Sequence, residues 1–161
     1  MKPLEHLRQL KLAKTKAMYP NVPDIALPKT EYNEKSANGL TKCVTDFLNL
    51  SGHQAERINT MGRMIDSRKQ VTDVIGRTKT IGSAKYIPTT GTKGSADISA
   101  TILGRSVKIE VKIGADRQSQ HQKDYQAMVE NAGGTYWIVK NFEQFYILYQ
   151  DFTRKILDLK K

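Results

Sequence analysis

The chain has 161 residues, 39% of them hydrophobic and 26% charged, which is typical of a globular domain large enough to bury a core. It has no run of 18 or more apolar residues, so we expect no membrane-spanning segment and no membrane partner. The 26 Lys and Arg against 16 Asp and Glu give a formal net charge of +10, which fits a polyanionic partner and, equally, a merely solvated basic surface.

Two features of the sequence bear on location. The single cysteine, Cys43, predicts neither an internal disulfide nor a cysteine-based zinc site. The opening MKPLEHLRQLKLAKTK lacks the apolar segment and the small-residue cleavage site of a secretory signal peptide. We therefore expect a cytoplasmic protein of a bacterial or phage-infected host cell.

The first 35 residues read as an extension of the domain. Residues 3–18 have apolar side chains at helical spacing with Lys and Arg between them, which predicts a short basic amphipathic helix; the apolar positions are Leu4, Leu7, Leu10 and Met18. Three prolines then fall within nine residues, which indicates a linker. We assign residues 1–35 to this helix and linker, and residues 36–161 to one domain that includes a C-terminal helix.

The domain begins with a helix that ends near Gly52. Its apolar side chains share one face: Leu40, Val44, Phe47 and Leu48. The segment AERINT, residues 55–60, predicts a short strand. The polar, basic stretch 61–88 predicts one or two strands around a mobile loop.

Further along, Ser119 predicts the N-cap of a third helix that ends at Gly133-Gly134. TYWIVK predicts a buried strand, and residues 142–161 have apolar side chains at helical spacing. The order of helix, strands, helix, strand and helix predicts an α/β domain with a mixed central sheet flanked by helices.

A hairpin is predicted between residues 97 and 113, where apolar and polar residues alternate. Alternation places Asp97, Glu110 and Lys112 on one face of the hairpin and the apolar residues on the other. With Gly104-Arg105 at the centre of a type II′ turn, Ile102 lies opposite Val107. Asp97 then lies opposite Lys112, and Asp97 and Glu110 are diagonal neighbours about 7–8 Å apart at the backbone.

These three charges predict a cation site. Hard divalent cations take one or two carboxylates together with other oxygens, and the backbone carbonyl of Val111 offers a further ligand. Lys112 would hold or deprotonate a water, or stabilise charge on a phosphate. The alternative is a set of exposed strand charges in which Asp97 and Lys112 form an ordinary cross-strand ion pair.

Asp97 followed by Glu110-Val111-Lys112 resembles the PD-(D/E)xK nuclease signature, with Ala96 in place of the usual proline. KGSADI, KIEVK and SQHQKDYQAMVENAGGTYWIVKN resemble the VRR-NUC branch, and the layout is similar to that of archaeal-type Holliday junction resolvases. The match covers roughly residues 37–142. The resemblance implies a restriction endonuclease-like core in α-β-β-β-α-β order, with extra N-terminal and C-terminal helices.

The resemblance also implies roles for individual residues. Asp97 and Glu110, with the Val111 carbonyl, would bind Mg²⁺ or Mn²⁺, and Lys112 would be the catalytic lysine. Gln122 falls where the family has a helix glutamine that supports the attacking water or the phosphate. Ser119 and Gln122 equally have the spacing of a capping box.

The sequence departs from the family on the first helix of the domain, the one that ends near Gly52. The family tends to have a glutamate there, whereas this chain has Asn38 or Ala37, with Glu34 about one turn earlier. Glu56 is a further candidate, with a salt bridge at the rim as the alternative. The departure bears on whether a second metal binds.

We therefore expect a metal-dependent nuclease that cuts DNA, with branched, flap or junction DNA as its target and a homodimer as its form. Contacts to nucleic acid are assigned to Arg57, Asn59, Arg63, Arg68, Lys69 and Lys93. The alternatives are a nucleic-acid-binding module that has lost cleavage, and a nuclease that acts on RNA. His53, His121 and Asp124 are interpreted as solvated or capping residues, and Tyr136 and Trp137 as core.

Overall fold

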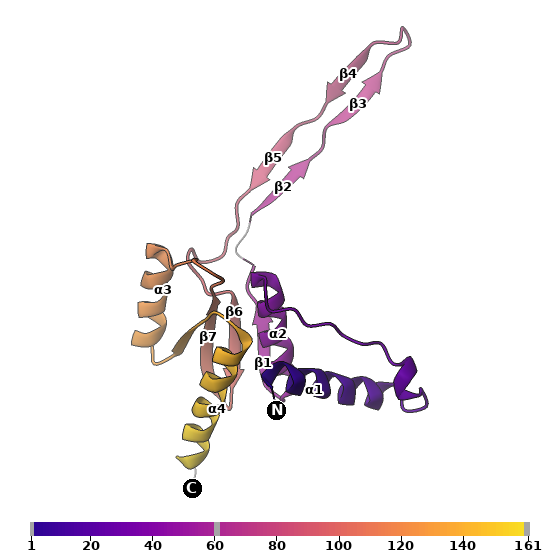
Figure 1. The fold of residues 1–161 in the computed structure, drawn as a ribbon. Coiled ribbons are helices and arrows are strands. Elements are labelled where there is room, and N and C mark those ends of the chain that lie inside the picture. The colour runs from indigo at the N-terminus through magenta and orange to yellow at the C-terminus, as the bar shows by residue number, and fades with distance from the viewer. Residues whose placement is uncertain (1, 60–61, 160–161) are drawn as a thin grey trace. The chain divides into compact units, whose positions relative to one another are not determined.

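The computed structural model describes residues 2–59 and 62–159. It divides into two compact units, which we call the body (Met1–Ile58 and Gly94–Lys161) and the ribbon (Asn59–Lys93) (Figure 1). The separation of residues 1–35 from the rest, which the sequence predicts, remains a prediction. Among the described residues, no helix combines the length and the apolar character that crossing a membrane requires.

The body is a mixed α/β unit. Its helices are α1 (Pro3–Met18), α2 (Ala37–Leu50), α3 (Gln120–Asn131) and α4 (Phe142–Asp158), with a short 3-10 turn η1 (Asp24–Ala26). Its strands are β1 (Gln54–Arg57), β6 (Ile98–Ile102), β7 (Arg105–Val111) and β8 (Thr135–Val139), in the order β1-β6-β7-β8. The first two pairings are antiparallel and the third is parallel, so the prediction of a mixed sheet is confirmed.

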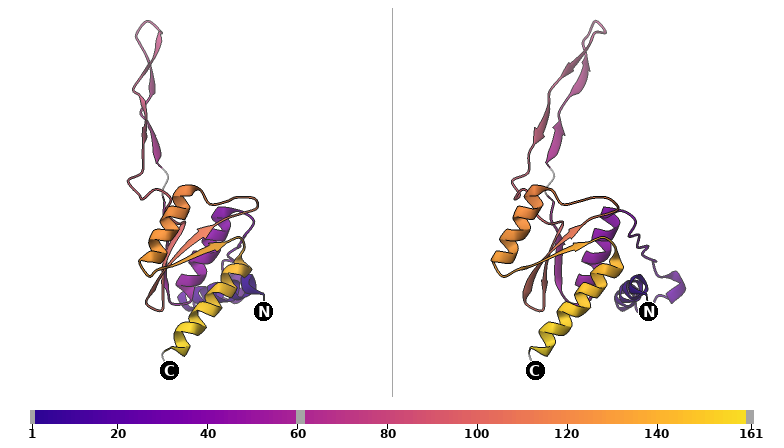
Figure 2. Two further views of the ribbon diagram at one scale, coloured as in Figure 1. Left: turned by 90° about the vertical axis from the view of Figure 1, so that its left-hand side faces the viewer. Right: turned by 60° about the vertical axis from the view of Figure 1, so that its left-hand side comes forward.

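Helices cover both faces of the sheet (Figure 2). Alternation along β6 and β7 sends Ile98 and Ile109 to the face that packs against α2 and α4, where both are fully buried. Phe47 of α2 makes edge-to-face contacts there with Phe142 and Phe145 of α4. The opposite face of the sheet, which we call the polar face, is covered by α3.

The first helix of the chain is only partly as predicted. Leu7 is fully buried against the body, but Met18, predicted on the same apolar stripe, is 63% exposed. Met18 is the last residue of α1, and Leu7 and Thr15 are the buried residues of this helix.

The hairpin of β6 and β7 has a different turn from the predicted one. Ile102 pairs with Arg105 and Ile98 pairs with Ile109, so the central residues are Leu103 and Gly104 rather than Gly104 and Arg105. Both have positive φ, 48° and 80°, which defines a type I′ turn whose twist suits a hairpin. Leu103 accepts this backbone because its side chain packs against the core. The predicted pairing of Ile102 with Val107 and of Asp97 with Lys112 is therefore wrong by two residues.

A shift of two residues keeps every side chain on its predicted face. It also changes which charges meet. Continued by one residue beyond Ile98 and Ile109, the observed register sets Asp97 directly opposite Glu110 instead of diagonally from it.

The ribbon consists of four short strands: β2 (Arg63–Asp66), β3 (Lys69–Thr72), β4 (Thr78–Ile81) and β5 (Ala84–Ile87). β2 pairs with β5 and β3 pairs with β4, both antiparallel. The prediction of one or two strands around a mobile loop is corrected accordingly. The strands form without a core because each pair satisfies its own backbone hydrogen bonds across the ribbon.

Candidate functional site

Four of the predicted site residues lie together on the polar face. Asp97 precedes β6, Glu110 lies in β7, Lys112 directly follows β7, and Gln122 lies in the first turn of α3. Because α3 covers this face, Gln122 reaches both Glu110 and Lys112. The structure therefore brings together Asp97, Glu110 and Lys112, which alternation predicts to converge, and Gln122, which the resemblance adds to them.

Glu110 is the most deeply buried charged residue described, with 1% of its surface exposed. Its Oε1 accepts a hydrogen bond from the Gln122 side-chain amide and lies 3.1 Å from Lys112 Nζ. Its Oε2 accepts from the Tyr136 hydroxyl at 3.4 Å. Burying a carboxylate is costly unless it is paired and hydrogen-bonded, and every partner here comes from a different element.

Lys112 is 6% exposed and is held by three acceptors. Besides Glu110, its Nζ donates to Gln122 Oε1 at 3.1 Å and to Asp116 Oδ2 at 3.2 Å. An ammonium group has three protons, so this geometry fixes the direction of each of them. Lys112 thus pairs with Glu110 and Asp116, in place of the alternative pairing with Asp97.

The first turn of α3 positions Gln122. Ser119 is the N-cap, and the Ser119 and Gln122 side chains form a complete capping box. Gln122 Oε1 accepts both from the Ser119 backbone N–H, at 2.9 Å, and from Lys112. The capping box is therefore confirmed, and the same side chain also contacts Lys112 and Glu110, while support of an attacking water or a phosphate stays a prediction.

Gly94 allows the chain to pass against that turn. A Cβ atom on Gly94 would lie 2.3 Å from the backbone oxygen of His121, and φ at Gly94 is +81°. Both the close approach and the positive φ favour glycine, which accounts for the second Gly of GTKGSAD.

Asp97 is half-buried and is hydrogen-bonded to the chain on both sides of β6. Its Oδ2 accepts from the Val111 backbone N–H at 2.9 Å, and its own carbonyl accepts from the Ile58 N–H at 2.8 Å. Along a strand the N–H and C=O of one residue point to the same side. Since the Lys112 N–H points to β8, where it donates to Val139, the Val111 carbonyl points to the side of Asp97.

The electrostatics of the site favour a cation. Burial raises the pKa of Glu110, and the nearby charge of Asp97 raises it further. Burial alone would lower the pKa of Lys112, but its hydrogen bonds and its attraction to Glu110 and Asp116 outweigh burial and raise it. The site thus contains two carboxylates that repel each other beside a lysine that stays charged.

The donor set fits Mg²⁺ or Mn²⁺, which prefer oxygen ligands. Two carboxylates and one backbone carbonyl converge between β6 and β7, and a bound cation would relieve the repulsion that raises the Glu110 pKa. In residues 2–59 and 62–159 no three His, Cys, Asp or Glu side chains gather as a metal site, and the Val111 carbonyl would add a backbone oxygen to the two carboxylates.

The residues considered on and near α2 as a further metal ligand, Asn38, Glu34 and Glu56, are placed as follows. Asn38 Oδ1 accepts from Arg57 Nη2 at 2.7 Å. Glu34 Oε2 accepts from the Phe142 N–H at 2.6 Å, and so satisfies a donor at the start of α4. Glu56 is exposed and pairs with Ser99, two positions along β6 from Asp97.

The residues assigned to nucleic acid are divided between the units. Arg57 lies in β1 of the body and contacts Asn38, whereas the other five lie in the ribbon: Asn59, Arg63, Arg68, Lys69 and Lys93. Arg68 forms a two-pronged ion pair with Asp66, the closest contact being 2.7 Å. Arg63 and Lys69 are exposed.

Two participants in the site were missed. Tyr136 is buried as predicted, yet its hydroxyl contacts Glu110, and burial together with the charge of Glu110 raises its pKa so that it stays protonated. A signal existed, because residues that share a face recur at every second position of TYWIV. Asp116 lies in the loop after β7, where no periodicity could place it.

Two of the three residues interpreted as solvated or capping are exposed: His121, and Asp124, which accepts from Gln120. His53 differs from that interpretation, because it is half-buried and its Nε2 lies 2.9 Å from the Tyr149 hydroxyl.

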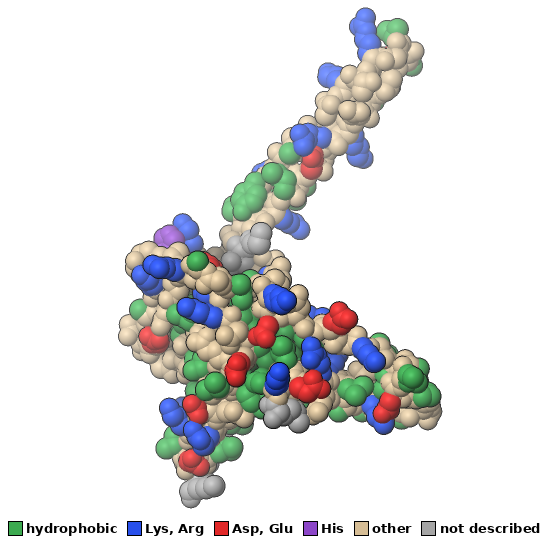
Figure 3. Space-filling model, in the orientation of Figure 1, with side chains coloured by type: hydrophobic (Ala, Val, Ile, Leu, Met, Phe, Trp, Pro, Cys, Tyr) green, Lys and Arg blue, Asp and Glu red, His purple; other side chains and the backbone are tan. Residues whose placement is uncertain are grey.

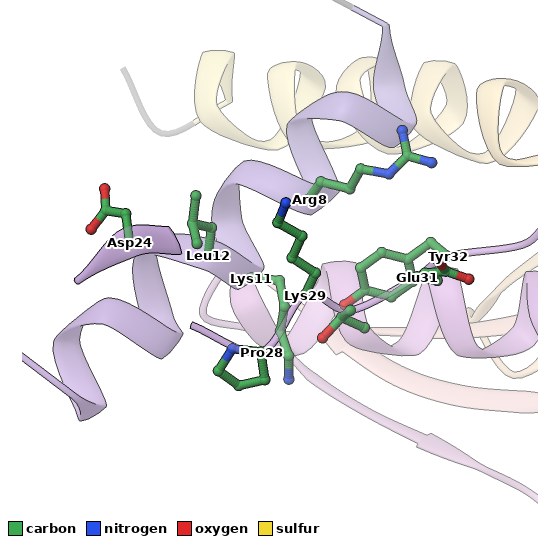
Figure 4. Close-up of a pocket in the computed structure, with 9 residues that line it drawn as sticks. Arg8, Lys11, Leu12, Asp24, Pro28, Lys29, Glu31 and Tyr32 are labelled. Carbon is green, nitrogen blue, oxygen red and sulfur yellow. The ribbon is translucent and has the colours of Figure 1, made fainter. Parts of the chain in front are cut away.

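A pocket of about 520 Å³ lies apart from these residues, between α1 and the segment that follows η1 (Figure 4). Its lining mixes both signs of charge with Leu12, Pro28 and Tyr32, and includes none of the four site residues. We therefore place the candidate site on the polar face and not in this pocket.

Neither the models of known protein families nor the curated proteins contain a match to this chain.

Proposed function

We propose that this protein is a metal-dependent nuclease that hydrolyses phosphodiester bonds in DNA. The observation that carries the proposal is the buried cluster of Glu110, Lys112 and Gln122 beside Asp97, in which two carboxylates and a lysine share one end of a hairpin. Strand charges without a function would be expected in water, since burying them costs stability.

Asp97, Glu110 and the Val111 carbonyl would hold Mg²⁺ or Mn²⁺. When bound, such a cation lowers the pKa of a water and polarises a phosphoryl oxygen. The carboxylates themselves supply the negative charge that makes this end of the hairpin attractive to a cation, and burial beneath α3 keeps competing water away from Glu110.

Lys112 would orient or deprotonate the attacking water and stabilise charge on the phosphate. Its raised pKa favours the charged form, so charge stabilisation is the role that its surroundings support better. Gln122 would position Lys112 and Glu110, since its amide binds both.

The proposed fold is restriction endonuclease-like, of the VRR-NUC branch, because the elements of the body from α2 to β8 have the α-β-β-β-α-β order, with the ribbon inserted between β1 and β6. By the same resemblance we propose branched, flap or junction DNA as the substrate and a homodimer, so that two symmetric cuts are made.

Cleavage of labelled DNA tests this function. Wild type is incubated with a four-way junction, a flap, a linear duplex and matched RNA, in Mg²⁺ or Mn²⁺. We expect DNA cleavage that Lys112→Ala reduces at least about 100-fold, as expected for loss of a catalytic proton-transfer or charge-stabilising group. Lys108→Ala is the matched control, because Lys108 lies in β7, the strand that Lys112 follows, and on the same face, but donates to Ser99.

Equal cleavage by Lys112→Ala and wild type would overturn the site assignment. If RNA is cut faster than DNA, the proposed substrate changes from DNA to RNA.

A second candidate is a nucleic-acid-binding module that does not cut. Asn38 favours it, because an amide held by Arg57 stands where the resemblance expects a carboxylate. DNA binding without cleavage in either metal would select this candidate.

A further inference from the structure

The four strands of the ribbon form one continuous antiparallel register. Pairing runs from Arg63 with Ile87 to Asp66 with Ala84, and resumes in the same register from Lys69 with Ile81. Between the two stretches, the Ser67 N–H donates to the Ser83 carbonyl at 3.0 Å. The paired segments 63–72 and 78–87 therefore extend for about 30 Å at about 3.3 Å per residue.

In each of its two strand pairs, the ribbon has one face on which a cation lies opposite an aliphatic side chain, and Ser67, Ser83 and Gly82, with φ +98°, lie between the two pairs. Alternation and register give Arg63–Ile87 and Ile65–Lys85 in the first strand pair, and Lys69–Ile81 and Val71–Lys79 in the second. The cation changes strand from one pair to the next, so positive charge follows both edges. Figure 3 shows Lys and Arg side chains along the whole ribbon. We call this surface the cationic face.

The other face has little free charge. Asp66 is neutralised by Arg68, and neutral polar residues follow it. Asp73, the second acid of the ribbon, is occupied in the turn, where its Oδ1 accepts from the N–H groups of Ile75 and Arg77. The ribbon has seven Lys and Arg against these two acids, so it carries half of the net charge of +10.

The turn at the tip exposes two aliphatic side chains. Val74 and Ile75 are 105% and 75% exposed. The turn is closed by the Gly76 N–H, which donates to the Asp73 carbonyl at 3.0 Å, and by the Asp73 N–H, which donates to Arg77. A polar turn would serve a hairpin equally well, so the exposed aliphatic pair requires a purpose.

We propose that the ribbon is a DNA-binding arm: its cationic face lies in a groove of duplex DNA, and Val74 and Ile75 press against a base step and bend the duplex. A two-stranded ribbon fits a DNA groove, and its length is close to one turn of B-DNA, about 34 Å. Apolar wedges at the tips of such elements unstack and kink DNA.

The arrangement of the charges favours DNA over a membrane surface. Membrane-bound amphipathic elements separate their apolar and charged side chains onto different faces, whereas here both kinds alternate on one face. Cations at both edges match the two phosphate backbones that border a groove. The inference shares DNA as the partner with the proposed function but requires no cleavage.

The first experiment removes the cationic face in a Lys112→Ala background without divalent metal, so that binding is measured apart from cleavage. Arg63, Lys69, Lys79 and Lys85 are changed together to Gln. We expect the slope of log affinity against log salt to fall by about 3–4, close to 0.9 per lost phosphate contact. The control changes four exposed lysines of the body to Gln: Lys14, Lys29, Lys35 and Lys155.

If the slope of log affinity against log salt is unchanged in the ribbon variant, or falls equally in the control, the proposal that the ribbon binds DNA is overturned. Ribbon-dependent binding that is tighter for duplex RNA or for anionic vesicles than for duplex DNA also overturns it.

The second experiment tests the tip. Val74→Ser with Ile75→Ser should leave the salt slope unchanged but reduce the bending of a duplex labelled at both ends for energy transfer. Ile25→Ser is the control, because Ile25 is 90% exposed in η1 of the body. If the double variant bends the duplex as much as wild type does, the proposal that Val74 and Ile75 bend DNA is overturned. Failure of either experiment leaves metal-dependent cleavage standing, and absence of cleavage leaves the arm standing, so the two failures are distinguishable.

Discussion

The body and the ribbon use charged residues in opposite ways. In the body, Glu110 and Lys112 are almost wholly buried, and each is held by partners from other elements. In the ribbon, the cations are exposed and the acids are neutralised or used in a turn. Few, buried and fully partnered charges thus indicate chemistry, whereas many exposed charges of one sign indicate binding.

Their sources of stability also differ. The body packs an aromatic cluster around Phe47, whereas the strands of the ribbon have no buried residue. The ribbon therefore depends on its backbone hydrogen bonds and cross-strand pairs alone.

The largest effect should come from the body core. Phe47→Ala is expected to lower the free energy of unfolding by about 3–5 kcal/mol, because it opens a cavity beneath the sheet. Val71→Ala, which shortens a half-exposed aliphatic side chain of the ribbon, should change it by about 0.5 kcal/mol or less. Urea denaturation measures both, and losses of similar size would contradict the contrast.

The proposed metal ligands come next. Asp97→Asn and Glu110→Gln should each reduce cleavage at least about 100-fold, since metal-ion catalysis contributes several kcal/mol. Asp124→Asn removes an exposed carboxylate of α3 that contacts only Gln120 among the contacts described here, and should cleave as wild type. Cleavage rates in Mn²⁺ measure this, and full activity in either ligand variant would remove that residue from the site.

The two roles of Gln122 can be separated at a smaller cost. Ser119→Ala breaks the capping box and should lower stability by about 1 kcal/mol with little effect on cleavage. Gln122→Ala also frees Glu110 and Lys112, so we expect cleavage to fall about tenfold in addition. Equal cleavage by the two variants would reduce Gln122 to a helix cap.

The smallest effect expected is a change of stability with pH, caused by the proton that Glu110 binds. Because the pKa of Glu110 is raised in the folded protein, the folded state holds that proton to higher pH than the unfolded state does. Without metal, wild type should therefore lose stability relative to Glu110→Gln as pH rises from the ordinary pKa of a glutamate towards the raised one. Denaturation across this range measures it, and a parallel pH dependence of the two proteins would count against a raised pKa.

Much of the body could be predicted from the sequence because its periodicities are clear. Leu40, Val44 and Phe47 are all buried on one face of α2, and alternation placed Asp97 and Glu110 on one face of the hairpin. The turn was misplaced because the choice between Gly104-Arg105 and Leu103-Gly104 depends on packing of Leu103, which no local pattern reports. The prediction that Asp97, Glu110 and Lys112 share one face still holds, because a shift of two residues leaves each side chain on the same face of the hairpin.

The ribbon and the loop after β7 were harder to predict. The alternation of Lys69, Val71, Lys79 and Ile81 resembles a solvated surface until the strands are paired. Asp116 contacts Lys112 through a loop, so its role depends on tertiary structure. What the sequence could not specify is therefore which partners the charges would have.

A crystal soaked with Mn²⁺ would show whether Asp97 and Glu110 bind a divalent cation. We predict an anomalous density peak in contact with the carboxylates of Asp97 and Glu110, lost in a crystal of Asp97→Asn. A saturating soak that leaves this end of the hairpin without a peak, in a preparation that cuts DNA, would contradict the account.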